Sequence, residues 1–165
     1  MAAGATYEPI ATTTLGSAAA SYTFSSIPST YTDLVVVCSA VTATVDNLVI
    51  NFNGDTASNY SWTTLGGNGT AASSTKGTST NLPYIQYASG VDTTRSTVIV
   101  NVMNYKNTTT FKTAICRGNN TAYGTDATIV LWRSTAAISS LTILTRGAVN
   151  LATGTILTLY GIAAA

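Results

Sequence analysis

The sequence predicts an all-β protein: an antiparallel β-sandwich of jelly-roll type with about eight to ten strands. Apolar residues alternate with a period of two in several short segments. Gly, Asn, Asp and Pro interrupt these segments roughly every eight to twelve residues, and no stretch has the spacing of an amphipathic helix. Short strands joined by turns, without intervening helices, are typical of sandwiches and barrels.

The chain of 165 residues is long enough for one domain, which we place at residues 16–165. Residues 1–15 precede it as an extended segment. Pro9 restricts this segment to a sheet edge or a strand start, because proline has no N–H to donate to a neighbouring strand. Two interpretations stay open. The segment is either an edge strand of its own domain or an arm that contacts another subunit, with Tyr7, Pro9 and Ile10 as candidate interface residues.

The stretch from Leu48 to Leu65 has the clearest strand pattern. Leu48, Ile50 and Phe52 share one face of a half-buried strand. Asn53-Gly54-Asp55 supplies residues that tolerate positive φ, so the chain is expected to reverse there. It resumes as a strand at Asn59, which predicts a β-hairpin.

The other segments follow the same pattern, with three local differences. The start of 33–44, DLVVVCSAV, is almost continuously apolar and predicts a strand buried on both faces. Residues 66–80 are rich in Gly, Ser and Thr and predict a long loop. Residues 106–109 predict a hairpin turn between two alternating strands. We expect strands at 21–25, 33–44, 82–87, 97–105, 111–116, 127–134, 138–146 and 154–162.

Charged residues make up only 8% of the chain, against about 25% in a typical globular protein. Seven Lys and Arg oppose six Asp and Glu, for a net charge of +1. Such a weak field argues against nucleic acid or an anionic membrane as a partner. The mean hydropathy of +0.28 comes without any run of about 18 apolar residues that could span a bilayer. A surface so poor in charge is best explained by contact with copies of itself or with a partner.

The first ten residues have neither a basic region nor an apolar core, so we expect no secretory signal. Cys38 and Cys116 both lie within apolar strand patterns. In a chain without an export signal we interpret them as buried small hydrophobic residues rather than as a disulfide.

The sequence contains no histidine, which excludes Ser-His and Cys-His nucleophiles. The acidic residues lie at strand ends and turns, where carboxylates usually cap backbone N–H groups. We therefore expect neither an enzyme nor a bound cofactor. A calcium site formed by Asn53, Asp55 and Asn59, with help from Asp46, is the alternative to the capping interpretation.

Tyr60 and Trp62 are the main candidate ligand residues, and the other aromatic residues near loops are Tyr84, Tyr87, Tyr105 and Tyr123. Aromatic rings beside Asn, Ser and Thr could stack on sugar rings and bind their hydroxyl groups. The competing interpretation, which we favour, makes these rings core or interface residues, because aromatic residues on strands usually serve packing.

Four blocks of the sequence, YEPIATTTLGS, YTFSSIPSTYTDLVV, FNGDTASNYSWTTL and GTILTLYGI, resemble those of small structural proteins of tailed bacteriophages, common in phages of cyanobacteria and marine bacteria. The resemblance covers most of the chain. It implies a β-sandwich virion component without catalytic residues: either a decoration (cement) protein on the capsid exterior or a tail-fibre or adhesin-type piece.

We therefore expect a capsid decoration protein, assembled in the bacterial cytoplasm and located on the virion surface. Its expected partners are the major capsid protein and copies of itself, as a homotrimer. Deletion of the arm at residues 1–15 should lower its occupancy on the particle while leaving the domain folded. The alternative is a receptor-binding module of the tail, with Tyr60, Trp62 and the loop at 66–80 facing a host glycan. A glycan depolymerase is the remaining enzymatic alternative.

Overall fold

The computed structural model describes residues 6–163, which form twelve strands in two antiparallel sheets. These residues contain no helix, and therefore none long and apolar enough to cross a membrane. The strands are β1 (Tyr7–Thr14), β2 (Ser21–Phe24), β3 (Asp33–Ala40), β4 (Asp46–Phe52), β5 (Tyr60–Gly67), β6 (Ala72–Thr80), β7 (Tyr84–Val91), β8 (Ser96–Met103), β9 (Lys112–Asn120), β10 (Gly124–Trp132), β11 (Leu141–Thr145) and β12 (Ile156–Ile162).

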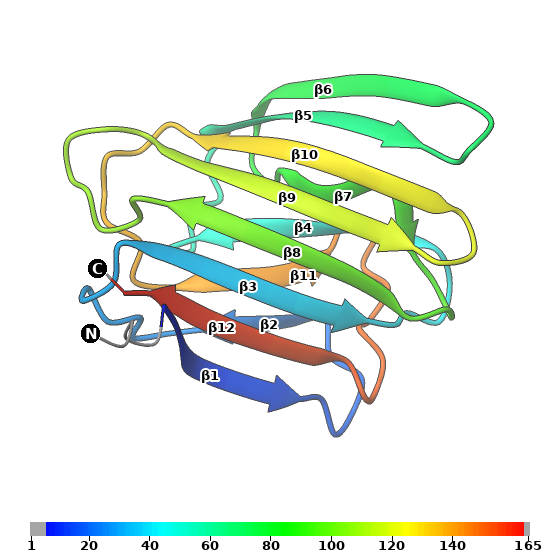
Figure 1. The fold of residues 1–165 in the computed structure, drawn as a ribbon, viewed down its shortest axis with the longest axis horizontal. Helices are drawn as coiled ribbons and strands as arrows, with labels where there is room; N and C mark the ends of the chain where they lie inside the picture. Colours follow the sequence, from blue (N-terminus) through cyan, green and yellow to red (C-terminus); the bar gives the residue numbers. More distant parts are fainter. Residues whose placement is uncertain (1–5, 164–165) are drawn as a thin grey trace.

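The two sheets form a jelly roll with one enlarged sheet (Figure 1). Strands β1-β12-β3-β8 lie in one sheet and β2-β11-β4-β7 form the other. Along the chain these eight strands alternate between the sheets, except that β4 and β7 lie in the same one. Strands β9, β10, β5 and β6 then extend the first sheet beyond β8, to eight strands. The predicted fold class is confirmed, with twelve strands rather than eight to ten. The extra strands arise from insertions between β4 and β7 and between β8 and β11.

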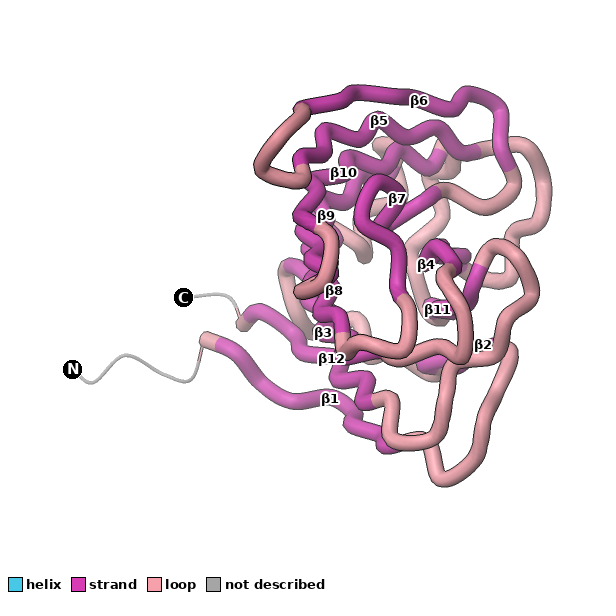
Figure 2. The backbone as a smooth tube through the Cα atoms, turned by 90° about the vertical axis from the view of Figure 1, so that its right-hand side faces the viewer, coloured by secondary structure: helices cyan, strands magenta, loops and turns pink. Residues whose placement is uncertain are grey.

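The core lies between the two layers (Figure 2). Strands β8, β9 and β10 of the large sheet bury every second side chain, as the two-residue period requires. Cys38 and Cys116 are both buried and free, which confirms their prediction as buried small residues. Val35, on the opposite face of β3, is also buried, as the continuous apolar pattern predicts.

The predicted hairpin of β4 and β5 is wrong. The turn is present, since Asn53 and Gly54 have φ values of 54° and 67°. However, β4 pairs with β7 and β11 in the small sheet, while β5 pairs with β6 and β10 in the large one. The turn therefore carries the chain from one layer to the other. Strand β4 is buried on both faces rather than half-buried, because Val49 and Asn51 are buried as well.

The predicted loop at 66–80 is also wrong for most of its length. Residues Ala72–Thr80 form β6, the edge strand of the large sheet, and pair with β5. Ser and Thr can occupy a solvated edge strand without apolar neighbours, so the segment lacks the alternation that would identify it. Lys76 lies on this edge, where a charged residue discourages pairing with another chain.

The amino-terminal segment forms the opposite edge of the large sheet. Strand β1 pairs with β12, and the register shifts between Pro9 and Ala11. Proline and a bulge both interrupt the row of exposed backbone donors and acceptors, as expected at a protected edge. From Tyr7 onward, the edge-strand interpretation therefore describes this segment. Residues 1–5, the start of the expected arm, lie outside the described part of the chain.

Candidate functional site

The most unusual surface is the solvent-facing side of β8, β9, β10 and β5, which we call the outer face. Its side chains alternate with those of the core, so the pairing registers place them in rows across the sheet. Four large apolar residues on or beside it are exposed: Leu65 by 61%, Ile129 by 55%, Phe111 by 52% and Ile115 by 43%.

The pairing register makes these residues neighbours. Ile129 of β10 lies directly opposite Ile115 of β9, and Leu65 of β5 lies opposite Ala127 of β10. Residues directly opposite on adjacent antiparallel strands have Cβ atoms about 5 Å apart. Leu65, Ala127, Ile129 and Ile115 thus form a contiguous apolar patch instead of scattered exposed side chains.

The outer face carries little charge. Among the outward positions of β5, β8, β9 and β10, Arg117 is the one charged residue, and about half of the others are Thr, Asn or Ser. Arg117 lies between Ile99 and Ala127 in the registers of β8 and β10. Arg133, just after β10, also reaches this side of the sheet, where its Nη2 donates to Ser61 Oγ at 3.1 Å. The face therefore combines apolar and hydrogen-bonding side chains with few charges, all of them positive.

Two of the three interface candidates in the amino-terminal segment are exposed. Tyr7 is 56% exposed and packs edge-on against Tyr160, with ring centroids 6.2 Å apart. Pro9 is exposed beside it. Ile10 instead packs, half-buried, against the core, so it anchors β1 to its own domain.

Tyr60 and Trp62 do not form a ligand surface. Tyr60 is completely buried, and its hydroxyl group accepts a hydrogen bond from the Phe52 N–H at 3.1 Å. Burial raises the pKa of Tyr60 well above its usual range. Trp62 is only 8% exposed and packs under Tyr84 and Tyr87. Both rings are therefore core residues, as the favoured interpretation predicted. Neither is exposed enough to stack directly on a ligand.

The calcium candidates serve as hydrogen-bonding groups. Asn53 Oδ1 accepts from the N–H groups of Ser139 and Ser140, while Asn59 Nδ2 donates to Asp55 Oδ2 at 3.0 Å. Asp55 also accepts from Nε1 of Trp132 and from the N–H of Ala57. These contacts favour the capping interpretation, because nitrogen donors occupy the oxygen atoms that a calcium ion would need.

Asp46 lies at the far end of β4 from this cluster. Its carboxylate accepts hydrogen bonds from the N–H groups of Gly147 and Val149 and holds the loop after β11. Within residues 6–163, no three Cys, Asp or Glu side chains come together in a way that could hold a metal ion.

The buried thiols are not activated nucleophiles. Burial raises the pKa of Cys38 to about 12. Burial and the nearby negative charge of Asp126 together raise the pKa of Cys116 above its usual range. Both thiols therefore stay protonated at neutral pH.

The apolar patch was not singled out from the sequence, although part of its signal is present. Phe111 and Ile115 alternate with Lys112, Ala114 and Cys116, which predicts a strand with two distinct faces. The sequence does not reveal that the face with Lys112 is the buried one.

A scan of the sequence against protein-family models found no match, and a search of curated proteins found none either.

Proposed function

We propose that this protein is a decoration protein of a tailed-bacteriophage capsid and that it binds the shell through its outer face. The observation that carries the proposal is the contiguous apolar patch of Leu65, Ala127, Ile129 and Ile115, on strands β5, β10 and β9 of an eight-stranded sheet. Contiguous exposed apolar patches on soluble proteins often mark binding surfaces.

The physical properties of the outer face suit a repeated, uncharged contact. Burying one half-exposed Leu or Ile side chain contributes about 1 kcal/mol, because complete burial of such a side chain contributes about 1.5–3 kcal/mol. Thr and Asn side chains around the patch can form the polar rim that specific interfaces have. A lattice repeats this modest contact many times, so that each added subunit stabilises the shell.

The charge of the outer face and the resemblance to phage structural proteins both support a capsid shell as the partner. Arg117 is the one outward charge on the four strands, so a complementary shell surface presents a carboxylate opposite it. The sequence blocks that resemble small phage structural proteins cover β1, β12, most of β2 and β5, and the first half of β3. We further propose that the subunits associate as homotrimers on the shell and that the protein's role is structural rather than catalytic.

The test is to measure the amount of protein on assembled particles by quantitative mass spectrometry, relative to the major capsid protein. The double variant Ile115→Lys/Ile129→Lys places two charges on the apolar patch. Both positions are substantially exposed, so the domain should still fold. We expect occupancy of the double variant to fall to less than about a fifth of the native value, because the contact would bury two unpaired charges.

Val45→Lys is the matched control. Val45 is 70% exposed just before β4, away from the outer face, and its substitution should leave occupancy unchanged. Unchanged occupancy of the double variant would show that the outer face is not the docking surface. A native copy number of about a dozen per particle, instead of hundreds, would assign the protein to the tail.

A further inference from the structure

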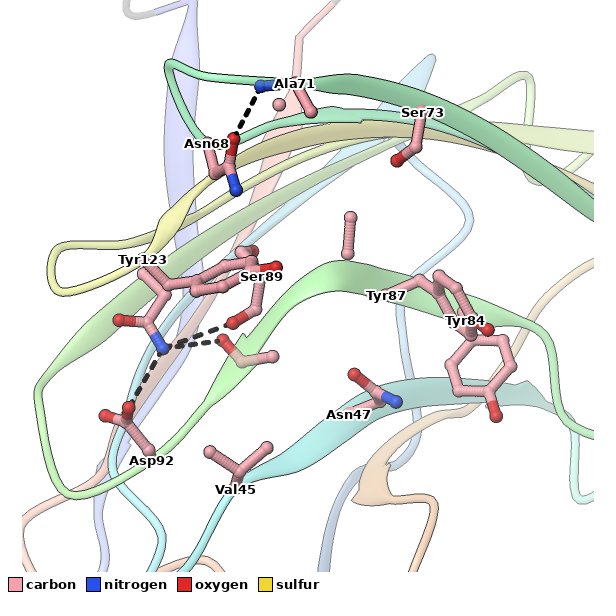
Figure 3. Close-up of a pocket in the computed structure, with 14 residues that line it drawn as sticks. Val45, Asn47, Asn68, Ala71, Ser73, Tyr84, Tyr87, Ser89, Asp92 and Tyr123 are labelled. Atoms are coloured by element: carbon pink, nitrogen blue, oxygen red, sulfur yellow. Dashed lines mark hydrogen bonds between the residues drawn. The ribbon is translucent and has the colours of Figure 1, made fainter.

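A groove lies on the opposite side of the extended sheet from the outer face, between the β5–β6 hairpin and the small sheet (Figure 3). It has a volume of about 720 Å³, which lies in the range of small-ligand sites. Strand β7 runs along the groove, residues 67–73 of the hairpin form one wall, and Val45 and Asn47 border the other side.

The aromatic residues of the groove are held rigidly. Tyr84 and Tyr87 of β7 pack edge to face, with ring centroids 4.7 Å apart. Trp62 packs against both rings. Its ring centroid lies 4.8 Å from that of Tyr84 and 5.2 Å from that of Tyr87. Arg146 contributes a cation–π contact to Tyr84 at 5.8 Å. This cluster leaves Tyr87 partly exposed, with its orientation set by buried neighbours.

Tyr123 lines the other end of the groove, on the turn between β9 and β10 (Figure 3). It is 58% exposed, and Asn120 stabilises its turn by accepting hydrogen bonds from Ala122 and Tyr123 N–H groups. The groove therefore presents exposed tyrosine rings at two separate places, both attached to ordered backbone.

Polar side chains lie between the tyrosines. Asp92 accepts hydrogen bonds from the Thr94 N–H at 2.6 Å and from Asn120 Nδ2 at 3.2 Å, and these two contacts lower the pKa of Asp92. Asn68 uses Oδ1 to accept from the N–H groups of Thr70 and Ala71, which leaves its Nδ2 as a donor at the groove wall. Asn47 and Ser73 add further polar groups.

We propose that this groove binds a neutral carbohydrate, with sugar rings stacked on Tyr87 and Tyr123 and hydroxyl groups bound by Asp92, Asn68 and Asn47. Sugar rings have apolar C–H faces and polar edges, and rigid aromatic rings beside carboxylate and amide groups match both. None of the lining residues is Lys or Arg, and the one lining carboxylate, Asp92, has a lowered pKa that favours its negative form. Arg146 lies beside the groove, but its guanidinium packs on the Tyr84 ring. The negative charge of Asp92 disfavours acidic glycans and phosphates, so the proposal is limited to uncharged sugars.

This proposal does not rest on the capsid assignment, because the groove and the outer face share none of their critical residues. A subunit bound to a shell through its outer face would leave the groove facing away from that contact. The proposal also revises the place of Trp62 in the glycan hypothesis: Trp62 supports the stacking residues from below instead of contacting the sugar.

The test is to apply the purified full-length protein to an array of neutral and acidic oligosaccharides, followed by calorimetric titration with the strongest neutral ligand. We expect binding to neutral oligosaccharides only. Tyr123→Ala should weaken the affinity at least about tenfold, because it removes one stacking ring. Tyr87→Ala should have a similar effect, whereas Tyr87→Phe, which keeps the ring on Trp62, should stay within about threefold of the native affinity.

Tyr7→Ala is the matched control, since Tyr7 is nearly as exposed as Tyr123 but lies on β1, at the far edge of the sheet. The affinity of Tyr7→Ala for the neutral oligosaccharide should equal that of the native protein. Circular dichroism of each variant separates loss of binding from loss of folding. The proposal is overturned if no neutral oligosaccharide binds, if only acidic ones bind, or if a folded Tyr123→Ala variant retains native affinity.

Discussion

Oδ2 of Asp55 accepts a hydrogen bond from Nε1 of Trp132 at 2.7 Å, and this contact joins the two sheets. Asp55 follows β4 of the small sheet, while Trp132 ends β10 of the large sheet. Trp132 also stacks on Tyr60, with ring centroids 6.1 Å apart. The turn that carries the chain between the layers is thus attached to the aromatic end of the core.

Replacement of Asp55 by alanine should destabilise the protein by about 2 kcal/mol, because it leaves the indole N–H of the buried Trp132 without its acceptor. Urea unfolding followed by tryptophan fluorescence measures this change. Asp55→Asn keeps one oxygen acceptor and should cost less than the alanine variant. Equal stability of Asp55→Ala and the native protein would show that the contact contributes nothing.

Stability should fall in acid. Burial opposes ionisation of Asp55, but hydrogen bonds from Asn59, Trp132 and the Ala57 N–H outweigh it, so the pKa of Asp55 is lowered. The hydrogen bonds to Asp92 lower its pKa as well. A carboxyl group with a lowered folded-state pKa stabilises the protein above its unfolded pKa of about 3.9. This contribution disappears as the pH falls through the folded-state value.

Urea midpoints at pH 7, 5, 4 and 3 test this dependence. The midpoint should change little between pH 7 and 5 and then decrease below about pH 4. The Asp55→Asn variant should show a shallower decrease, since it lacks one of the two titrating groups. A midpoint that rises on acidification would contradict the lowered pKa values of Asp55 and Asp92.

Gly77→Ala should destabilise the protein by about 1–3 kcal/mol through overpacking. A Cβ atom at Gly77 of β6 would lie 2.3 Å from Nε1 of Trp62, so the buried indole would have to move. Gly16→Ala is the control, because a Cβ atom there would meet nothing within 4 Å. Thermal unfolding of both variants measures the difference. Equal melting temperatures would show that β6 moves aside without cost.

Deletion of residues 1–14 should destabilise the domain, in contrast to the expectation from the sequence that the domain stays folded without its arm. The deletion removes all of β1, including Ile10 and Ala11, which pack against the core. The loss of these contacts should cost about 2 kcal/mol or more. The comparison is with deletion of residues 1–5, which keeps all of β1. Equal midpoints for the two truncations would show that β1 is dispensable.

The strands that the sequence predicted well are those with alternating apolar residues and clear turns. β8, β9 and their connection at 106–109 form the expected hairpin, and β10, β11 and β12 coincide closely with the expected segments. Strand β6 was missed because its Ser and Thr residues, on a solvated edge, show no alternation of apolar and polar side chains. The glycan candidates Tyr60 and Trp62 proved to be buried, whereas Tyr87 and Tyr123, further along the chain, line the groove.

The sequence by itself determined the all-β class, because alternation along a strand depends only on local geometry. It also determined the turn at Asn53 and Gly54, where the backbone requires positive φ. The tertiary structure alone decided which sheet each strand joins and which of its two faces is covered. In β9 it buried the face with Lys112 and exposed the one with Ile115. The two-residue period gives each strand two faces, but which face is buried depends on the sheet that packs against it.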